Sequence, residues 1–176
     1  MIKPRPLVMA GLILAAAASR LLPHPPNFTP IAAMALFAGA YFGAKRWAFA
    51  VPLAAMVLSD LVIGLHPLLA LVYGSFALIV SIGFWLRARR RMMPIAGAAL
   101  ASSFLFFLVT NFGVWALGSF YPKTPQGLLV CYVAAIPFFR NTLLGDAVYT
   151  AALFGGFRLI ERGFAVVRES VLTPSQ

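Results

Sequence analysis

The sequence has 176 residues, of which 62% are hydrophobic and only 10% are charged, and its mean hydropathy is +0.93. Soluble domains carry about 45–50% apolar and about 25% charged residues, and a water-soluble domain of this length has too much surface to hide such an excess. The composition therefore excludes a soluble enzyme. It predicts a single transmembrane domain over residues 1–176, because the apolar segments follow one another without a linker.

The apolar segments predict an all-α fold, a polytopic bundle of about six transmembrane helices. The expected spans are residues 7–22, 30–44, 47–65, 68–86, 94–117 and 139–160. Between the first two lies a proline-rich loop, Pro23 to Pro30, because four prolines fix the backbone and remove hydrogen-bond donors. The second span is short for a hydrocarbon core of about 30 Å, so it is expected to begin in this loop or to lie beside a thinned or water-filled region.

The last apolar stretch, residues 127–160, is longer than one span requires. We divide it at Pro137, because a proline inside a helix removes a backbone hydrogen bond. Its first part is expected to be an interfacial or re-entrant half-helix on the outer side, and its second part the sixth span.

The net charge of +10 is distributed in short clusters between apolar runs. These clusters are Lys3 and Arg5; Lys45 and Arg46; Arg87, Arg89, Arg90 and Arg91; and Arg158, Arg162 and Arg168. Basic clusters beside apolar segments mark cytoplasmic loops, where they face the anionic headgroups of the lipid bilayer. The pattern predicts a multi-pass protein of the cytoplasmic (inner) membrane with both termini in the cytoplasm, and it disfavours nucleic acid as a partner.

Ionisable side chains within spans are costly, so each usually has a partner or faces water. The expected network of buried charges consists of Arg20, Asp60, Arg140 and Asp146. Three pairings across helices are open: Arg20 with Asp60, Arg20 with Asp146, or Arg140 with Asp60. These charges either clamp the bundle as structural ion pairs or line a polar cavity that opens outward, and the two roles are compatible.

Polar and aromatic residues concentrate toward the outer ends of the spans, as in small-molecule sites with a few polar groups on an apolar wall. The expected substrate-binding residues are His24, Asn27, Tyr73, Asn111, Trp115, Tyr121, Arg140 and Asn141. We expect an outward pocket of several hundred Å3, covered by the proline-rich loop, in which Arg140 or Asn141 binds an anionic or amide group of the ligand.

Catalytic and nucleotide-binding motifs are absent from the sequence, so we expect neither an enzyme nor a cofactor. His24 and His66 are far apart in sequence and do not form a metal motif. Cys131 could ligate a soft metal centre, but a lone cysteine in a membrane helix is more often a small packing residue. Gly11, Ala15 and Ser19 form a strip of small residues on which another helix, within the molecule or from a partner, could pack closely.

Two motifs, Leu22 to Phe37 and Cys131 to Asp146, resemble those of a widespread bacterial six-helix membrane family of unknown function, and the likeness covers about Arg20 to Gly155. More loosely, Pro30 followed by residues 37–43 and Asp60 is similar to the S components of energy-coupling-factor vitamin transporters. That resemblance implies an S-component-like fold and uptake of a small organic nutrient, such as a vitamin. It also implies a coupling transmembrane subunit that docks on the Gly11 strip, with associated ATPases. The alternative is a non-transporting structural or assembly protein.

Overall fold

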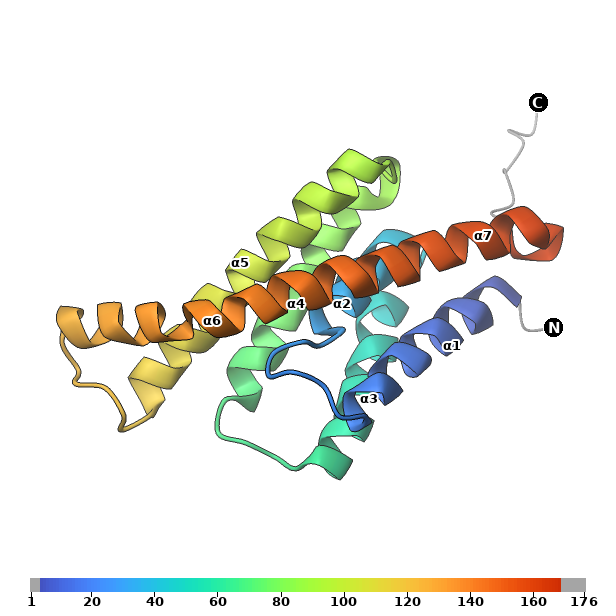
Figure 1. Ribbon diagram of the computed structural model, residues 1–176. Helices are drawn as coiled ribbons and strands as arrows, with labels where there is room; N and C mark the ends of the chain where they lie inside the picture. The colour runs from blue at the N-terminus through green and yellow to red at the C-terminus, as the bar shows by residue number, and fades with distance from the viewer. Residues whose placement is uncertain (1–3, 169–176) are drawn as a thin grey trace.

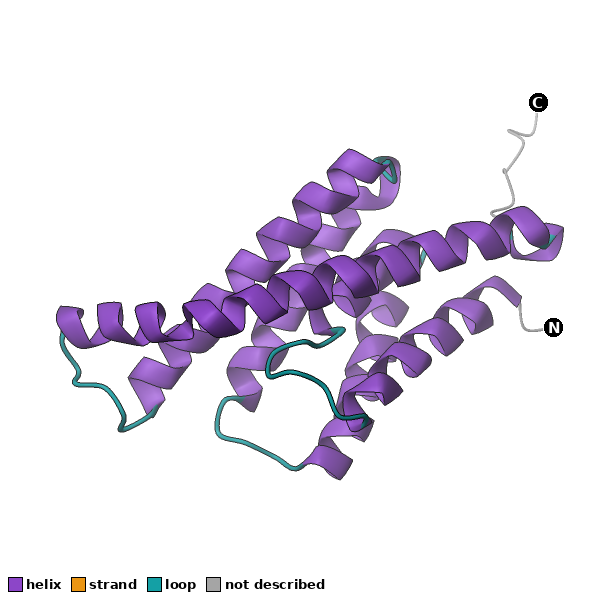
Figure 2. Ribbon diagram, in the orientation of Figure 1, coloured by secondary structure: helices purple, strands orange, loops and turns teal. Residues whose placement is uncertain are grey.

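The computed structural model describes residues 4–168, which form helices joined by short loops and contain no strand (Figures 1 and 2). The α-helices are α1 (Pro4–Ala18), α2 (Ile31–Tyr41), α3 (Lys45–Ile63), α4 (Leu69–Trp85), α5 (Met92–Leu117), α6 (Pro125–Thr150) and α7 (Gly156–Gly163). Short 3-10 segments η1 (Ser19–Leu21), η2 (Leu86–Ala88) and η4 (Ala165–Val167) extend or follow helix ends, and the π-helix η3 (Ala151–Gly155) joins α6 to α7. The predicted all-α class is confirmed for this part of the chain.

Four helical segments are long and apolar enough to cross a membrane. They are Lys45–Ile63, Leu69–Ala88, Met92–Leu117 and Pro125–Gly163. The expected spans in these four regions are thus supported by length and composition. The first two expected spans are shorter in the structure, since α1 has 15 residues and α2 has 11. Six crossings, the type of membrane and the side on which the termini lie remain predictions.

Helix α2 forms the centre of the bundle, and every one of its residues is buried. It packs against α1, α3, α4, α5 and α6. Its contact with α4 is a close backbone approach, because a Cβ atom added to Gly39 would lie 2.8 Å from the Gly83 Cα atom. Glycines permit this approach in the way that small residues do in membrane helix pairs. The short second helix therefore needs no contact with lipid, since its neighbours enclose it.

The carboxyl end of α2 is stabilised by Arg87 in η2. Its Nε atom donates to the Gly39 carbonyl at 3.0 Å, and its Nη2 atom donates to the Phe42 carbonyl at 2.7 Å. The last carbonyls of a helix have no partner within the helix, and a cation there also interacts favourably with the helix dipole. One arginine of the predicted cytoplasmic cluster thus has a structural role inside the fold.

The predicted half-helix before the last span is wrong. Helices α6, η3 and α7 form one continuous helical segment, Pro125–Gly163, of 39 residues, and Pro137 lies inside α6 without breaking it. A proline removes only one backbone donor, and packing against neighbouring helices lets a membrane helix tolerate that loss. A helix of this length extends about 58 Å, so it either tilts strongly or projects beyond a core of about 30 Å.

Basic residues from three parts of the sequence meet at one end of the bundle. Arg5 in α1 forms an ion pair with Glu161 in α7 at 2.5 Å and donates to the Val167 carbonyl at 2.9 Å. Arg158 in α7 donates to the Arg90 carbonyl in the connection between α4 and α5. Figure 1 shows the start of α1 beside the end of α7.

Candidate functional site

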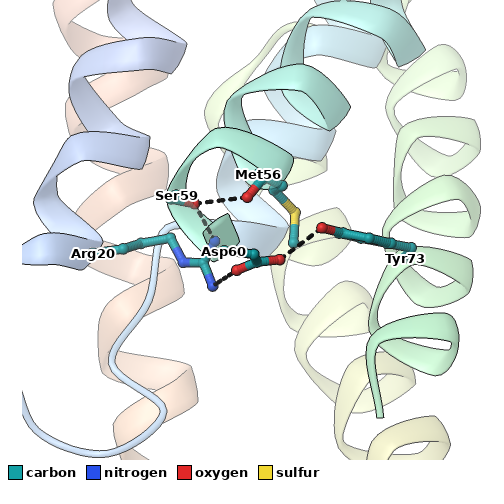
Figure 3. Close-up of polar contacts among 5 residues, drawn as sticks. All are labelled: Arg20, Met56, Ser59, Asp60 and Tyr73. Atoms are coloured by element: carbon teal, nitrogen blue, oxygen red, sulfur yellow. Dashed lines mark hydrogen bonds and ion pairs between the residues drawn. The ribbon is translucent and has the colours of Figure 1, made fainter. Parts of the chain in front are cut away.

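A buried polar network joins the first, third and fourth α-helical regions (Figure 3). Arg20 in η1 donates from Nη2 to the Asp60 Oδ1 atom at 2.7 Å and from Nη1 to the Ser59 Oγ atom at 2.5 Å. Tyr73 in α4 donates to the Asp60 Oδ2 atom at 2.7 Å. Of the three pairings that the sequence left open, the structure contains Arg20 with Asp60.

This network has little capacity left for a ligand. The side chains of Arg20 and Asp60 are only 9% and 2% exposed, and both carboxylate oxygens already accept a hydrogen bond. The Ser59 hydroxyl donates in turn to the Met56 carbonyl at 2.9 Å. Buried charges that are paired and fully hydrogen-bonded clamp the elements that carry them. Tyr73, expected to bind substrate, is a member of this clamp.

The proline-rich loop lies directly on α6. Asn141 donates from Nδ2 to the Pro26 carbonyl at 2.9 Å, and a Cβ atom on Gly145 would lie 3.2 Å from the Phe28 Cα atom. Within the loop, Asn27 adopts a left-handed backbone with φ of +63°, which asparagine tolerates better than most residues. His24 is exposed, and its Nδ1 atom lies 2.7 Å from the Leu22 carbonyl oxygen. Asn141 therefore anchors the loop.

A second group of expected ligand-binding residues organises the turn between α5 and α6. Trp115 donates from Nε1 to the Pro122 carbonyl at 2.9 Å, while Asn111 donates to the Phe107 carbonyl of its own helix at 2.8 Å. Tyr121 is partly buried in this turn, and Arg140 is exposed on α6 and forms no ion pair with the described residues. Trp115 thus satisfies a loop carbonyl, where a backbone group needs a donor, and Asn111 bonds within its own helix. The eight expected residues thus do not line a common pocket among the described residues.

Asp146 has surroundings different from those of Asp60. Its Oδ2 atom accepts a hydrogen bond from the Ser103 hydroxyl in α5 at 2.6 Å, and the residue is 3% exposed. No arginine or lysine of the described residues pairs with it, so the expected arginine partner for this carboxyl is wrong. Ser103 also lies 3.0 Å from the Ala99 carbonyl of its own helix.

Asp146 lines a cavity of about 500 Å3 between α5 and the α6–α7 segment. From α5 the lining residues are Met92, Ile95, Ala96, Ala99, Leu100 and Ser103. From the other side they are Leu143, Asp146, Ala147, Thr150, Ala151, Phe154, Gly155 and Arg158. None of the eight residues expected to bind substrate belongs to this set.

The polar groups of this cavity are few, and one has no partner. The Thr150 hydroxyl is buried and makes no hydrogen bond to any described residue. It lies one turn after Asp146, and the π-helix η3 follows immediately. Such π-helical turns inside α-helices occur frequently at functional sites. Asp146, Ser103 and Thr150 therefore form the candidate site, which we call the α5–α6 cavity.

The spacing of Asp146 and Thr150 in the sequence indicates this site, although neither residue was among the predicted substrate-binding residues. Asp146 and Thr150 are four residues apart and share one face of a helix, which a ligand can contact from one side. The wall residues Ala96, Ala99, Ala147, Ala151 and Gly155 are small, so the two helices leave space between them. Among residues 4–168, no group of three His, Cys, Asp or Glu side chains is arranged to hold a metal ion.

The described residues form a helical bundle with four segments long and apolar enough to cross a membrane and a small-molecule-sized space between two of them. The chain belongs to the family of unknown function DUF6580, whose model matches residues 1–169. No curated protein and no solved structure matches it. Membership in a family of unknown function confirms that part of the resemblance found in the sequence, whereas the likeness to S components gains no support from these comparisons.

Proposed function

We propose that the protein is a membrane-embedded binding protein that takes a small organic molecule into the α5–α6 cavity, as the substrate-capturing part of an uptake system. The observation that carries the proposal is the buried carboxyl of Asp146, which has no basic partner among the described residues and faces a cavity of about 500 Å3. Small-molecule sites usually measure about 300–1,000 Å3 and combine apolar walls with a few polar groups.

The chemistry of the cavity indicates what its ligand supplies. An unsatisfied buried hydroxyl such as that of Thr150 costs about 1–3 kcal/mol, and a bound molecule with a suitable donor or acceptor removes this cost. The Asp146 Oδ2 atom is occupied by Ser103, which leaves Oδ1 for a ligand. A mostly apolar molecule with one hydrogen-bonding group at the level of Asp146 and Thr150 fits both conditions.

The proposal also includes a partner protein that couples uptake to a source of energy. Gly11 and Ala15 lie exposed on α1, and a Cβ atom on Gly11 would meet nothing within 4 Å. Ser19 instead lies 2.8 Å from the Tyr149 hydroxyl, so the docking strip reduces to the first two residues. A coupling transmembrane subunit with ATPases, in the manner of an S component, would supply the nucleotide-binding motif that this sequence lacks.

The alternative is a structural or assembly protein whose buried charges only hold the bundle together. The observation in its favour is the Arg20–Asp60 clamp, which is fully hydrogen-bonded and leaves both carboxylate oxygens occupied. A structural protein needs no ligand in the α5–α6 cavity. Whether a molecule binds there therefore distinguishes the two functions.

The test is to fill the cavity. Ala96 is exposed in its wall, so Ala96→Trp places an indole in the space without displacing core residues. Ala134→Trp, at an exposed position of α6 outside the cavity, is the matched control. Small molecules released from each purified protein are compared by mass spectrometry. We expect a molecule that co-purifies with the wild type and the control but not with Ala96→Trp. Equal recovery from all three proteins would refute the proposal.

A further inference from the structure

One arginine belongs to two adjoining spaces of the molecule. Arg158 in α7 lines the α5–α6 cavity, and it also lines a second cavity of about 510 Å3. The other residues around the second cavity are Glu161, Arg162 and Arg168. An apolar space and a basic space therefore adjoin at a single side chain, at the end of the bundle where the basic clusters meet. We call the second space the arginine cavity.

The charge of the arginine cavity is strongly positive. The one carboxylate among the described residues around it, Glu161, forms an ion pair with Arg5 at 2.5 Å. Arg168 donates to the carbonyls of Glu161 and Arg162 at 2.9 Å each, and Arg158 donates to the carbonyl of Arg90. No carboxylate among the described residues pairs with Arg158, Arg162 or Arg168. These contacts hold two of the guanidinium groups in place while leaving their charge available to an anion.

We infer that the ligand of the α5–α6 cavity is an anionic amphiphile, whose apolar body lies between α5 and α6 and whose phosphate or other anionic head contacts Arg158, Arg162 and Arg168. The inference rests on the proposed function, since it names the ligand class of that same site. Thr150 and Arg158 are eight residues apart, which is about 12 Å along a helix, and Asp146 is about 18 Å from Arg158. An extended, mostly apolar chain that carries its one hydrogen-bonding group about 12–18 Å from an anionic head matches this separation of Thr150 and Asp146 from the cluster of cations.

A general attraction of cytoplasmic arginines to acidic headgroups is a different explanation and makes a different prediction. Such attraction contributes about 1 kcal/mol per basic residue near the surface, wherever that residue lies. Under that explanation, Lys45, Arg46 and Arg89 matter as much as the arginine cavity, because they are exposed and line neither space. Filling the α5–α6 cavity would then leave binding of an anionic amphiphile unchanged.

The experiment measures binding of decyl phosphate to the full chain in dodecyl maltoside by native mass spectrometry, with zwitterionic decyl phosphocholine as the comparison probe. We expect Arg158→Ala combined with Arg162→Ala and Arg168→Ala to weaken binding of decyl phosphate about tenfold or more. The matched control, Lys45→Ala with Arg46→Ala and Arg89→Ala, removes the same charge and should bind as the wild type does. Arg158→Gln alone, which leaves the other two arginines in place, provides a milder variant whose folding is checked by size-exclusion chromatography.

Two results would overturn the inference: equal binding of the two decyl probes, or equal weakening by the two triple substitutions. In either case the co-purification test still reports on the proposed function, which fails if the wild type, Ala96→Trp and Ala134→Trp release the same molecules in equal amounts. Nanodiscs of phosphatidylcholine with or without phosphatidylglycerol distinguish a bilayer lipid from a soluble molecule as the carrier of the anionic head. Displacement of decyl phosphate by phosphatidylglycerol supports a bilayer lipid as the ligand, and no displacement supports a soluble anionic amphiphile.

Discussion

Two aspartates lie buried in this bundle, and their surroundings differ. Asp60 accepts from Arg20 and Tyr73, so its charge and both of its oxygens are matched within the fold. Asp146 accepts from Ser103 and faces a cavity in which the Thr150 hydroxyl has no partner among residues 4–168. A buried ionisable group is thus not by itself a sign of function in a membrane protein. The two carboxyl groups differ in whether the described residues use up the hydrogen-bonding capacity around them, and the proposed function of Asp146 rests on that difference.

The largest effect is expected from Asp60→Ala. The substitution leaves the Arg20 guanidinium buried without its carboxylate, and breaking a buried pair in this way costs about 3–5 kcal/mol. Unfolding titrations in mixed detergent micelles measure the loss, with Leu61→Ala, at an exposed position next to it, as the control. A loss no greater than that of the control would remove the contrast between the two aspartates.

Tyr73→Phe is expected to have the next largest effect. It removes one hydrogen bond to the Asp60 carboxylate but leaves the ion pair with Arg20 in place. A hydrogen bond to a charged group contributes about 1.5–3 kcal/mol, so the free energy of unfolding should fall by that amount. Because Tyr73 belongs to the clamp and not to the α5–α6 cavity, binding of decyl phosphate should be unchanged. Loss of binding with unchanged stability would instead support the sequence-based prediction that Tyr73 contacts the ligand.

Thr150→Val should stabilise the protein by about 1 kcal/mol in the absence of ligand. The two side chains have the same shape, and valine lacks the hydroxyl that is buried without a partner. The same unfolding titration measures this gain, and the co-purified molecule should be recovered in smaller amount. Thr142→Val is the control, because the Thr142 hydroxyl is hydrogen-bonded to the Phe138 carbonyl at 3.3 Å. If both variants lose stability equally, the hydroxyl of Thr150 has a partner.

The smallest effect on stability is expected for Asp146→Asn, within about 0.5 kcal/mol of the wild type as for substitutions that break no contact. An asparagine oxygen still accepts from Ser103, and the Ser103 hydroxyl has the Ala99 carbonyl as a second acceptor at 3.0 Å. Recovery of the co-purified molecule should nevertheless decrease, because the amide presents different groups to the ligand. A large loss of stability with unchanged recovery would make Asp146 a second structural residue.

Much of the fold could be predicted from the sequence, because composition and periodicity determine where membrane helices form. The long helices α3, α4 and α5 lie where their apolar runs indicated, and Arg20 with Asp60 was among the pairings considered. Pro137 was misleading, since the local rule that proline ends a helix holds less strictly where neighbouring helices support the segment. The expected sixth span, residues 139–160, runs through η3 into α7 as the structure does, but the helix begins earlier, at Pro125.

The candidate site was harder to predict, because its position depends on which helix faces meet. Asn141 and Trp115 looked like ligand-binding residues, but they bind carbonyls of the proline-rich loop and of the turn after α5. The sequence cannot show which carbonyls lack a partner until the chain is folded. Conversely, the α5–α6 cavity arises where small residues of two helices face each other, and this pairing is a property of the packing. Only the spacing of Asp146 and Thr150 pointed to it.

The enclosed position of α2 has a consequence for biosynthesis. A helix of 11 residues is about 16 Å long and cannot cross a core of about 30 Å unaided when it first leaves the ribosome. Its carboxyl end is satisfied by Arg87, and its close approach to Gly83 also awaits α4. Helix α2 can therefore reach its enclosed position only after segments more than forty residues further along the chain have been translated. Ribosome-arrested chains that end before α4 should hold α2 accessible to water-soluble thiol reagents at an introduced cysteine, whereas full-length chains should protect it.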